Sequence, residues 1–245
     1  MFNFFKKKIK HINYESLKID FHSHILPELD DGSENMEESI ELLRKMQGFG
    51  YTHLIMSPHV MGDFYKNTPE MILEKLQLLQ EASDANGLQI TLLASAEYYL
   101  DEWFDEKIKA KQLLPFAKNK ILFEISYVNE PHNLFDTIFN LQIAGFQPIL
   151  AHPERYSFFH SRYDMYEKIA QTGCRLQVNL LSLIGYYGPN EKRIAEKLID
   201  NKLAYYLSSD AHKLKHLELL PNVFESELYH EAIKQSHHLE LLSEL

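Results

Sequence analysis

The chain has 245 residues, one cysteine and a formal net charge of −10, from 25 Lys and Arg against 35 Asp and Glu. Hydrophobic residues make up 45% and charged residues 24%, a balance typical of a globular protein that folds without disulfides or a structural metal. The acidic balance argues against a nucleic-acid-binding protein, the single cysteine excludes an internal disulfide framework, and no apolar run approaches the ~20 residues of a membrane span.

Short apolar runs alternate with helical patterns through the first half of the chain. Asn35, with Glu38 three residues later, is typical of a capping box at a helix start, and Thr68-Pro69 is typical of another start. The strands predicted in this half cover residues 17–21, 52–56, 90–94 and 121–125, and a short helix is predicted near 102–111.

The second half continues the alternation. Strands are predicted at 147–151, 175–180 and 203–207, and helices at 131–144, 163–172, 191–201 and from 225 onward. Seven strands with intervening helices predict a parallel sheet, and at this length a closed or nearly closed α/β barrel in a single domain is favoured over an open doubly wound sheet. Two glycine-rich motifs bind phosphate after a strand, G-x-G-x-x-G and G-x-x-x-x-G-K-[ST], and neither occurs after any of these strands.

Histidine and carboxylate side chains lie at the ends of six predicted strands. They are Asp20, His22 and His24; His59; Glu97; Glu124; His152, Glu154 and Arg155; and Asp210 and His212. Because the carboxyl ends of parallel strands converge on one face of a barrel, we expect these side chains to share one small volume. Residues two apart in a strand point to the same side, so His22 with His24 and Asp210 with His212 are suited to share a metal ion. Mixed imidazole and carboxylate ligands favour Zn, Mn or Fe, and several sets side by side indicate two or three ions.

The remaining histidines and the cysteine are not predicted to carry chemistry. We expect surface positions for His11, His53, His132, His160, His216, His230, His237 and His238. Cys174 has Leu180 where the cysteine-dependent tyrosine phosphatases carry arginine, so a packed core position is expected for it.

These motifs in combination resemble the polymerase and histidinol phosphatase (PHP) superfamily. The H-x-H-I-L-P opening with D-D-G at residues 30–32, and H-P-E-R-Y at 152–156, are similar to the metal-dependent protein-tyrosine phosphatases of bacterial capsule and exopolysaccharide synthesis. The resemblance covers roughly residues 19–216. The chain departs from the family pattern around His59, in the segment 213–216, which lacks an arginine, and in the tail from 218.

The resemblance implies a distorted (β/α)7 barrel over residues 18–245 after an N-terminal extension, 1–17. It implies three divalent metal ions, usually manganese, with Fe or Zn also suited. The implied ligands are His22, His24, Glu97 and Asp210 for the first ion, Glu97, Glu124 and His152 for the second, and His59, His212 and an acid of the Asp30-Asp31 pair, with Asp31 favoured, for the third. Arg155 is implied to contact the substrate phosphate.

The implied activity is hydrolysis of phosphotyrosine on a protein, specifically the tail of a bacterial tyrosine kinase. Two alternatives stay open: a histidinol-phosphatase-like enzyme acting on a small molecule, and a non-catalytic, metal-stabilised PHP module. We expect a cytoplasmic protein without a nucleic-acid partner, whose basic and aromatic residues 1–10 make at most a peripheral membrane contact.

Overall fold

Parallel strands form the centre of the molecule. The computed structural model describes residues 17–245, so the predicted membrane contact and His11 lie outside the described residues. Every pairing between named strands is parallel. The strands are β1 (Ile19–Asp20), β2 (His53–Met56), β3 (His59–Val60), β4 (Thr91–Ala94), β5 (Glu97–Tyr99), β6 (Lys120–Glu124), β7 (Gln147–Ala151), β8 (Arg175–Asn179) and β9 (Ala204–Ser208).

These nine segments follow seven strand paths around a ring. One sheet has the order β1-β2-β4 and the other β3-β5-β6-β7-β8-β9. β2 and β3 are halves of one path interrupted at Ser57-Pro58, where proline has no N–H to donate, and β4 and β5 are likewise interrupted at Ser95-Ala96. The prediction of seven strands is therefore confirmed, with two of the strands broken.

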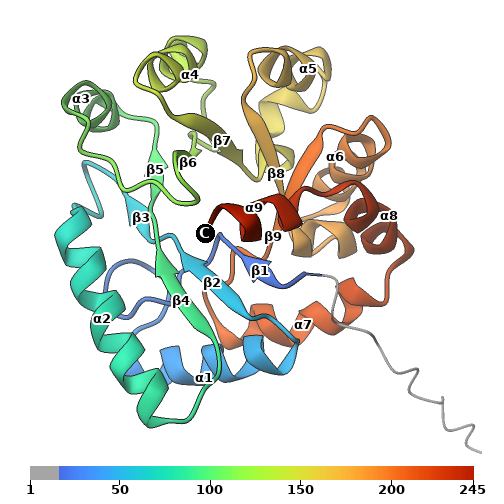
Figure 1. The fold of residues 1–245 in the computed structure, drawn as a ribbon. Helices are drawn as coiled ribbons and strands as arrows, with labels where there is room; N and C mark the ends of the chain where they lie inside the picture. The colour runs from blue at the N-terminus through green and yellow to red at the C-terminus, as the bar shows by residue number, and fades with distance from the viewer. Residues whose placement is uncertain (1–16) are drawn as a thin grey trace, which may run out of the picture.

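The first and last strands join at their carboxyl ends. Ser23 and Ala211 form a parallel bridge, His24 N donates to Ala211 O (2.9 Å) and Asp210 N donates to His22 O (2.8 Å). These contacts connect β1 to β9, and Figure 1 shows the resulting ring of strands with helices around it. The fold is a distorted (β/α)7 barrel in a single domain, as predicted, rather than an open sheet.

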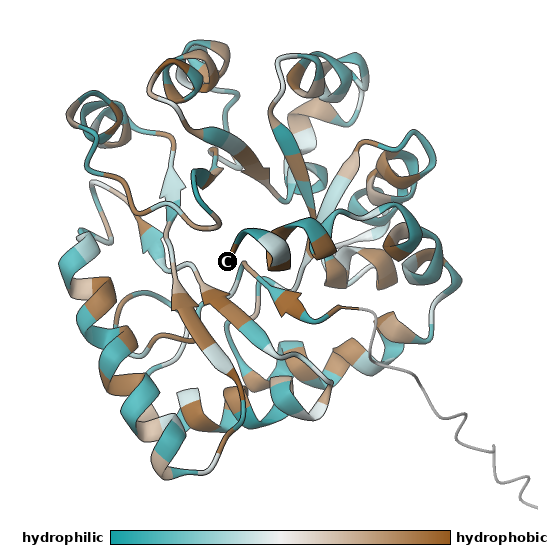
Figure 2. Ribbon diagram, in the orientation of Figure 1, coloured by the Kyte–Doolittle hydropathy of each residue, from teal (hydrophilic) through white to brown (hydrophobic). Residues whose placement is uncertain are grey.

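Helices surround the ring of strands, with α9 at one end of it, and they bury apolar side chains in the core; Figure 2 shows the hydropathy of each residue along them. They are α1 (Met36–Gly48), α2 (Pro69–Ala85), α3 (Glu102–Ala110), α4 (Leu134–Ile143), α5 (Asp164–Gln171), α6 (Pro189–Asp200), α7 (Leu214–Phe224), α8 (Glu227–Gln235) and α9 (His238–Glu244). Asn35 Oδ1 accepts from Glu38 N (2.9 Å) and Thr68 Oγ1 from Met71 N (3.4 Å), so both predicted N-caps are confirmed. No helix described in this part of the chain is long and apolar enough to cross a membrane.

Two helices differ from the prediction. α4 begins at Leu134, since residues 132–133 form a turn between Pro131 and the helix. α7 lies outside the predicted helices; Pro221 in its interior disfavours a helix, yet the helix forms and buries Leu217 and Leu220 in the core.

The C-terminal helix α9 closes the amino-terminal end of the barrel. Leu241 of α9 belongs to the same buried cluster as Ile19, Phe21 and Tyr206 from the strands, and α9 lies across the centre of the ring in Figure 1. The predicted surface position of His238 is wrong: its side chain is buried and its Nε2 donates to Leu207 O, because α9 is folded into the barrel end. Cys174 is buried and burial raises the pKa of its thiol to about 12, so its predicted core position is confirmed.

Candidate metal centre

All nine predicted metal ligands lie together at the carboxyl end of the barrel. They form four overlapping groups in which one donor atom per residue lies within 4.8 Å of the others: His24, Asp31, His59 and His212; His22, Glu97 and His152; His22, His24 and Asp210; and His59, Glu97 and Glu124. The strand ends bring these residues together from positions up to 190 apart in the chain. Two of them, His152 and Asp210, have left-handed backbone (φ 31° and 50°), a strained conformation that concentrates at functional sites.

The innermost cluster brings two imidazole nitrogens and two carboxylate oxygens close together. His22 Nε2 lies 3.2 Å from Glu97 Oε2, 3.3 Å from Asp210 Oδ1 and 3.3 Å from His24 Nε2. His24 Nε2 lies 3.4 Å from each of the same two carboxylate oxygens. Imidazole and carboxylate donors this close together are suited to share one divalent cation.

Glu97 connects this cluster to a second one. Its Oε2 faces His22 and His24, and its Oε1 lies 3.0 Å from His152 Nε2. Glu124 completes the second cluster, with Oε2 3.9 Å from His152 Nε2. A carboxylate whose two oxygens face different donor sets is suited to bridge two cations.

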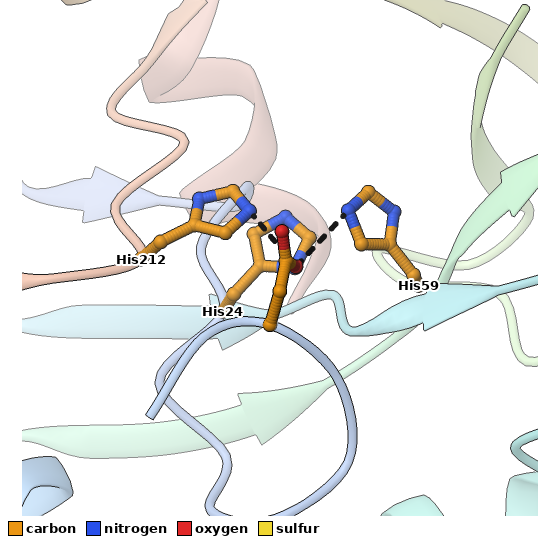
Figure 3. A group of neighbouring side chains, drawn as sticks. His24, His59 and His212 are labelled. Carbon is orange, nitrogen blue, oxygen red and sulfur yellow. Dashed lines mark ion pairs between the residues drawn. The ribbon is translucent and has the colours of Figure 1, made fainter. Parts of the chain in front are cut away.

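The third cluster lies nearer the surface. Asp31 Oδ1 lies 3.6 Å from His59 Nε2 and 3.5 Å from His212 Nε2. These two ion pairs are the dashed lines of Figure 3, where the ring of His24 lies between the rings of His59 and His212. The other ring nitrogen of His59, Nδ1, lies 3.1 Å from Glu97 Oε2 and 3.2 Å from Glu124 Oε1. The imidazole of His59 therefore faces two clusters at once.

Asp30 and Asp31 differ in what they contact. Asp30 is buried against His24: its Oδ2 accepts from His24 Nδ1 (2.6 Å) and from His59 N (2.9 Å), and its Oδ1 from Gly32 N (2.9 Å). With its lone pairs engaged in this way, Asp30 is placed to orient His24, whereas the half-exposed Asp31 carboxylate is placed to meet a cation. Only glycine fits at position 32, because a Cβ there would lie 2.0 Å from His24 O.

Acceptors behind the histidines determine which ring nitrogen faces the centre. The Nδ1 atoms of His22, His24 and His212 donate to Gln177 Oε1 (2.8 Å), Asp30 Oδ2 (2.6 Å) and Asp210 O (2.9 Å) respectively. Each acceptor keeps a proton on Nδ1, so the Nε2 lone pair is left for a cation. This arrangement of a ligand histidine backed by an oxygen acceptor is usual in protein metal sites.

Opposite charges are concentrated in the site. Burial opposes ionisation of Glu97 and Asp210, but the surrounding histidines hold the pKa of both carboxyls well below the usual value. Burial lowers the pKa of His22, yet Glu97 and Asp210 raise it overall, and despite burial the carboxylates around His59 raise its pKa to about 10. Glu97 and Asp210 are thus ionised, and protonation of His22 and His59 is favoured in the role that metal cations can take.

The donors present fit divalent metal ions. Glu97 Oε2 and His59 Nδ1 are buried and have no hydrogen-bond partner among the described residues. Such atoms are costly to bury unless something satisfies them, and divalent cations bound among these side chains would do so. The mixture of imidazole and carboxylate suits Mn, Fe or Zn better than Ca.

Arg155 adjoins the clusters between two tyrosines. Its Nη1 donates to Asp210 Oδ2 (3.0 Å), and its guanidinium lies 4.8 Å from the ring centre of Tyr127 and 4.2 Å from that of Tyr187. Burial alone would lower its pKa, but Tyr127 and Asp210 raise it above its usual value, so the side chain is a fixed cation.

A pocket of about 290 Å³ opens onto this end of the barrel. Seven predicted site residues line it: Asp31, His59, Glu124, His152, Arg155, Asp210 and His212. Met61, Phe64, Tyr65 and Tyr127 complete the lining. The buried His22, His24 and Glu97 do not line it, so the pocket exposes part of the candidate metal ligands together with Arg155.

Sequence reasoning missed the residues that support the predicted ligands. Gln177 lies at the third position of β8, and Asn179 at its end donates through Nδ2 to Asp210 Oδ2 (2.9 Å) and to Tyr187 Oη (3.1 Å). Both are buried polar residues that alternate with the apolar Leu176 and Val178, which was the available signal. The sixth predicted strand thus also contributes to the site, although it carries no predicted ligand.

Known proteins resemble the chain over most of its length. The family model described as capsular polysaccharide synthesis, CpsB/CapC, matches residues 18–235. CapC of Staphylococcus aureus, named as a tyrosine-protein phosphatase, is 31% identical over 197 residues, covering 80% of this chain and 77% of CapC. The tyrosine-protein phosphatase YwqE of Bacillus subtilis is 29% identical over 198 residues, covering 80% and 78%.

Solved structures agree with these sequence matches. A crystal structure from work on YwqE of Bacillus subtilis and CpsB of Streptococcus pneumoniae, described as unique metal-dependent tyrosine phosphatases, superposes with a TM-score of 0.81 at 27% identity and covers 92% of this chain and 94% of that chain. A histidinol phosphate phosphatase from Lactococcus lactis, at 13% identity and a TM-score of 0.54, covers 85% of this chain and 92% of its own, and shares the fold. The chain belongs to the CpsB/CapC family of capsular polysaccharide synthesis proteins.

Proposed function

We propose that this chain is a metal-dependent protein-tyrosine phosphatase of capsular or exopolysaccharide synthesis, acting on phosphotyrosine in the tail of a bacterial tyrosine kinase. The observation that carries the proposal is the convergence of nine His, Asp and Glu side chains at a pocket that Arg155 also lines. The activity in the names of CapC and YwqE, and in the description of the YwqE and CpsB crystal structures, supports it.

Three divalent ions, manganese by preference with Fe or Zn as substitutes, are proposed to occupy the clusters, and residues 18–245 are proposed to be the catalytic domain after the extension 1–17. The proposed sets are His22, His24, Glu97 and Asp210; Glu97, Glu124 and His152; and Asp31, His59 and His212. When bound, such ions would stabilise charge on phosphoryl oxygens and lower the pKa of a bound water.

Arg155 is proposed to bind the substrate phosphate. A planar guanidinium matches two phosphate oxygens, and the flanking Tyr127 and Tyr187 hold it in place at the pocket. The tyrosine side chain released by the reaction has a pKa of ~10, lower than that of an aliphatic alcohol, so its departure needs less help from a general acid.

The test is hydrolysis of a phosphotyrosine peptide by the purified protein, first treated with a chelator and then assayed with and without Mn²⁺. We expect activity to be lost on chelation and restored by Mn²⁺. Histidinol phosphate is assayed in parallel.

A preference for histidinol phosphate would replace the proposed substrate with a small molecule. Protein that binds Mn²⁺ but hydrolyses neither ester would identify a metal-stabilised module without catalytic activity. Activity that survives complete metal removal would contradict the role proposed for the metals.

A further inference from the structure

The loop after β3 is held in a defined shape next to the pocket. Met61 N donates to Tyr65 O (2.9 Å) and Tyr65 N to Met61 O (3.1 Å), which closes a five-residue turn. Gly62 N donates to Asp101 Oδ2 (2.8 Å), and the other oxygen of Asp101 accepts from Phe104 N (2.8 Å) to cap α3. The loop is therefore fixed both internally and to the neighbouring helix.

Phe64 is exposed on this fixed loop. Its side chain is 77% exposed, although it lines the pocket and large apolar side chains usually pack into the core. The adjacent Tyr65 has a structural contact, since its ring stacks on His59 with centroids 5.7 Å apart and an interplanar angle of 15°. Phe64 has no described ring partner of this kind, so core packing does not account for its position.

The pocket lining divides into two chemical classes. Its seven predicted site residues are charged or imidazole side chains, and the other four, Met61, Phe64, Tyr65 and Tyr127, are apolar or aromatic. A phosphate monoester has the same division, because its phosphoryl group is anionic and the rest of a phenyl ester is an aromatic ring. When the phosphoryl group lies at the clusters and Arg155, the ring of the ester lies beside the apolar and aromatic side chains.

We propose that Phe64, together with Tyr127, contacts the aromatic ring of the substrate and makes the pocket selective for aryl phosphates over alkyl phosphates. The inference rests on the proposed phosphatase activity and adds the residues that select tyrosine. Tyr127 is 40% exposed and also stacks on His152 (centroids 5.7 Å apart), so contact with a site residue fixes the orientation of its ring. Aromatic pairs favour offset or edge-to-face contact, which a phenyl ring at the pocket entrance can make with Phe64.

The test compares Phe64→Ala with wild-type protein on a phosphotyrosine peptide and on an alkyl phosphate. Dividing the rate of the variant by that of wild type for each substrate removes the intrinsic difference between the two leaving groups. We expect kcat/KM for the phosphotyrosine peptide to fall about 3–10-fold, mostly through KM, and that for the alkyl phosphate to change less than about 2-fold. Phe64→Trp should restore the phosphotyrosine rate, and Phe64→Leu should restore only part of it.

Two controls separate ring recognition from damage to the site. Inhibition by inorganic phosphate, which has no ring, should be unchanged in Phe64→Ala. Phe139→Ala removes another exposed phenylalanine (60%) on the outer helix α4, and should leave both substrates unaffected.

Equal loss on both substrates, or full activity of Phe64→Ala on the phosphotyrosine peptide, would overturn the inference while leaving the proposed function intact. Failure of the wild-type protein to hydrolyse the phosphotyrosine peptide with Mn²⁺ bound would instead remove the proposed function, and the inference with it.

Discussion

At the scale of single residues, the neighbouring carboxylates Asp30 and Asp31 have different environments. The Asp30 carboxylate accepts from His24 Nδ1, His59 N and Gly32 N and is buried, whereas the Asp31 side chain is 57% exposed and lies beside His59 and His212. The geometry supports Asp31 as the ligand and Asp30 as the residue that orients His24.

Substituting each aspartate with asparagine should separate these two roles. Asp31→Asn removes one anionic donor, so we expect the metal content of the protein to fall by about one ion per chain with little change in the stability of the metal-free protein. Asp30→Asn places an amide N–H where N–H groups of neighbouring residues now donate to the Asp30 carboxylate. We therefore expect metal affinity to fall about 10–100-fold and the free energy of unfolding of the metal-free protein to fall by about 1–3 kcal/mol. Elemental analysis and urea unfolding in a chelator measure the two effects. Identical behaviour of the two variants would contradict the assignment.

Arg155 is the residue at which phosphate binding can be tested apart from metal binding. We expect Arg155→Ala to lower kcat/KM for a phosphotyrosine peptide about 10²-fold, as for the loss of one donor to a developing negative charge, with the metal content unchanged. Arg155→Lys should recover only part of the rate, because an ammonium cannot match two phosphate oxygens. Arg193→Ala, on the exposed face of α6, is the matched control. An unaltered rate for Arg155→Ala would remove this residue from the mechanism.

At the scale of elements, α9 contributes to the barrel core through one face. Leu241 is fully buried with Ile19 and Phe21, whereas Leu239 on the same helix is 73% exposed. We expect Leu241→Ala to destabilise the protein by about 2–5 kcal/mol, because a cavity opens in the barrel end, and Leu239→Ala to change stability by less than about 0.5 kcal/mol. Urea unfolding curves of the two variants measure this, and equal stabilities would show that α9 does not close the barrel.

The strand pattern was predictable because its signals are local. Apolar runs bounded by turns predicted seven strands, and polar residues placed after them predicted which end of the barrel carries the site. The i, i+2 spacing of His22 and His24 needed no tertiary information, since side chains two apart in an extended segment share a side.

Other features depend on tertiary contacts that local patterns do not contain. Pro221 argues against a helix locally, but burial of the α7 face outweighs that cost. His238 follows a polar segment and has an exposed neighbour in Leu239, so only the docking of α9 shows that it is buried. Gln177 and Asn179 acquire their roles from residues after β1 and after β9, which lie far away in the chain.

At the scale of the whole molecule, His238 makes folding stability depend on pH. Burial lowers the pKa of this histidine from 6.5 to about 4, although a hydrogen bond to Leu207 O acts in the opposite direction. Its Nδ1 is buried and has no hydrogen-bond partner among the described residues, so a second proton would be left unpaired in the barrel end. Since the pKa in the folded state is below that in the unfolded state, the unfolded chain binds the extra proton first. The contribution of neutral His238 to the free energy of unfolding is therefore complete above pH 6.5 and is lost as the pH falls toward 4.

His238→Gln isolates this effect, because glutamine can still donate to Leu207 O but does not titrate. Between pH 7.5 and pH 5 the wild-type free energy of unfolding should fall by about 2 kcal/mol more than that of the variant. Urea unfolding in a chelator measures both proteins, and subtraction cancels the titration of the metal-binding histidines that they share. His230→Gln, at an exposed position on α8, should follow wild type at both pH values. Parallel curves for wild type and His238→Gln would mean that the barrel end admits water or a charge partner for His238, and that α9 opens without unfolding the barrel.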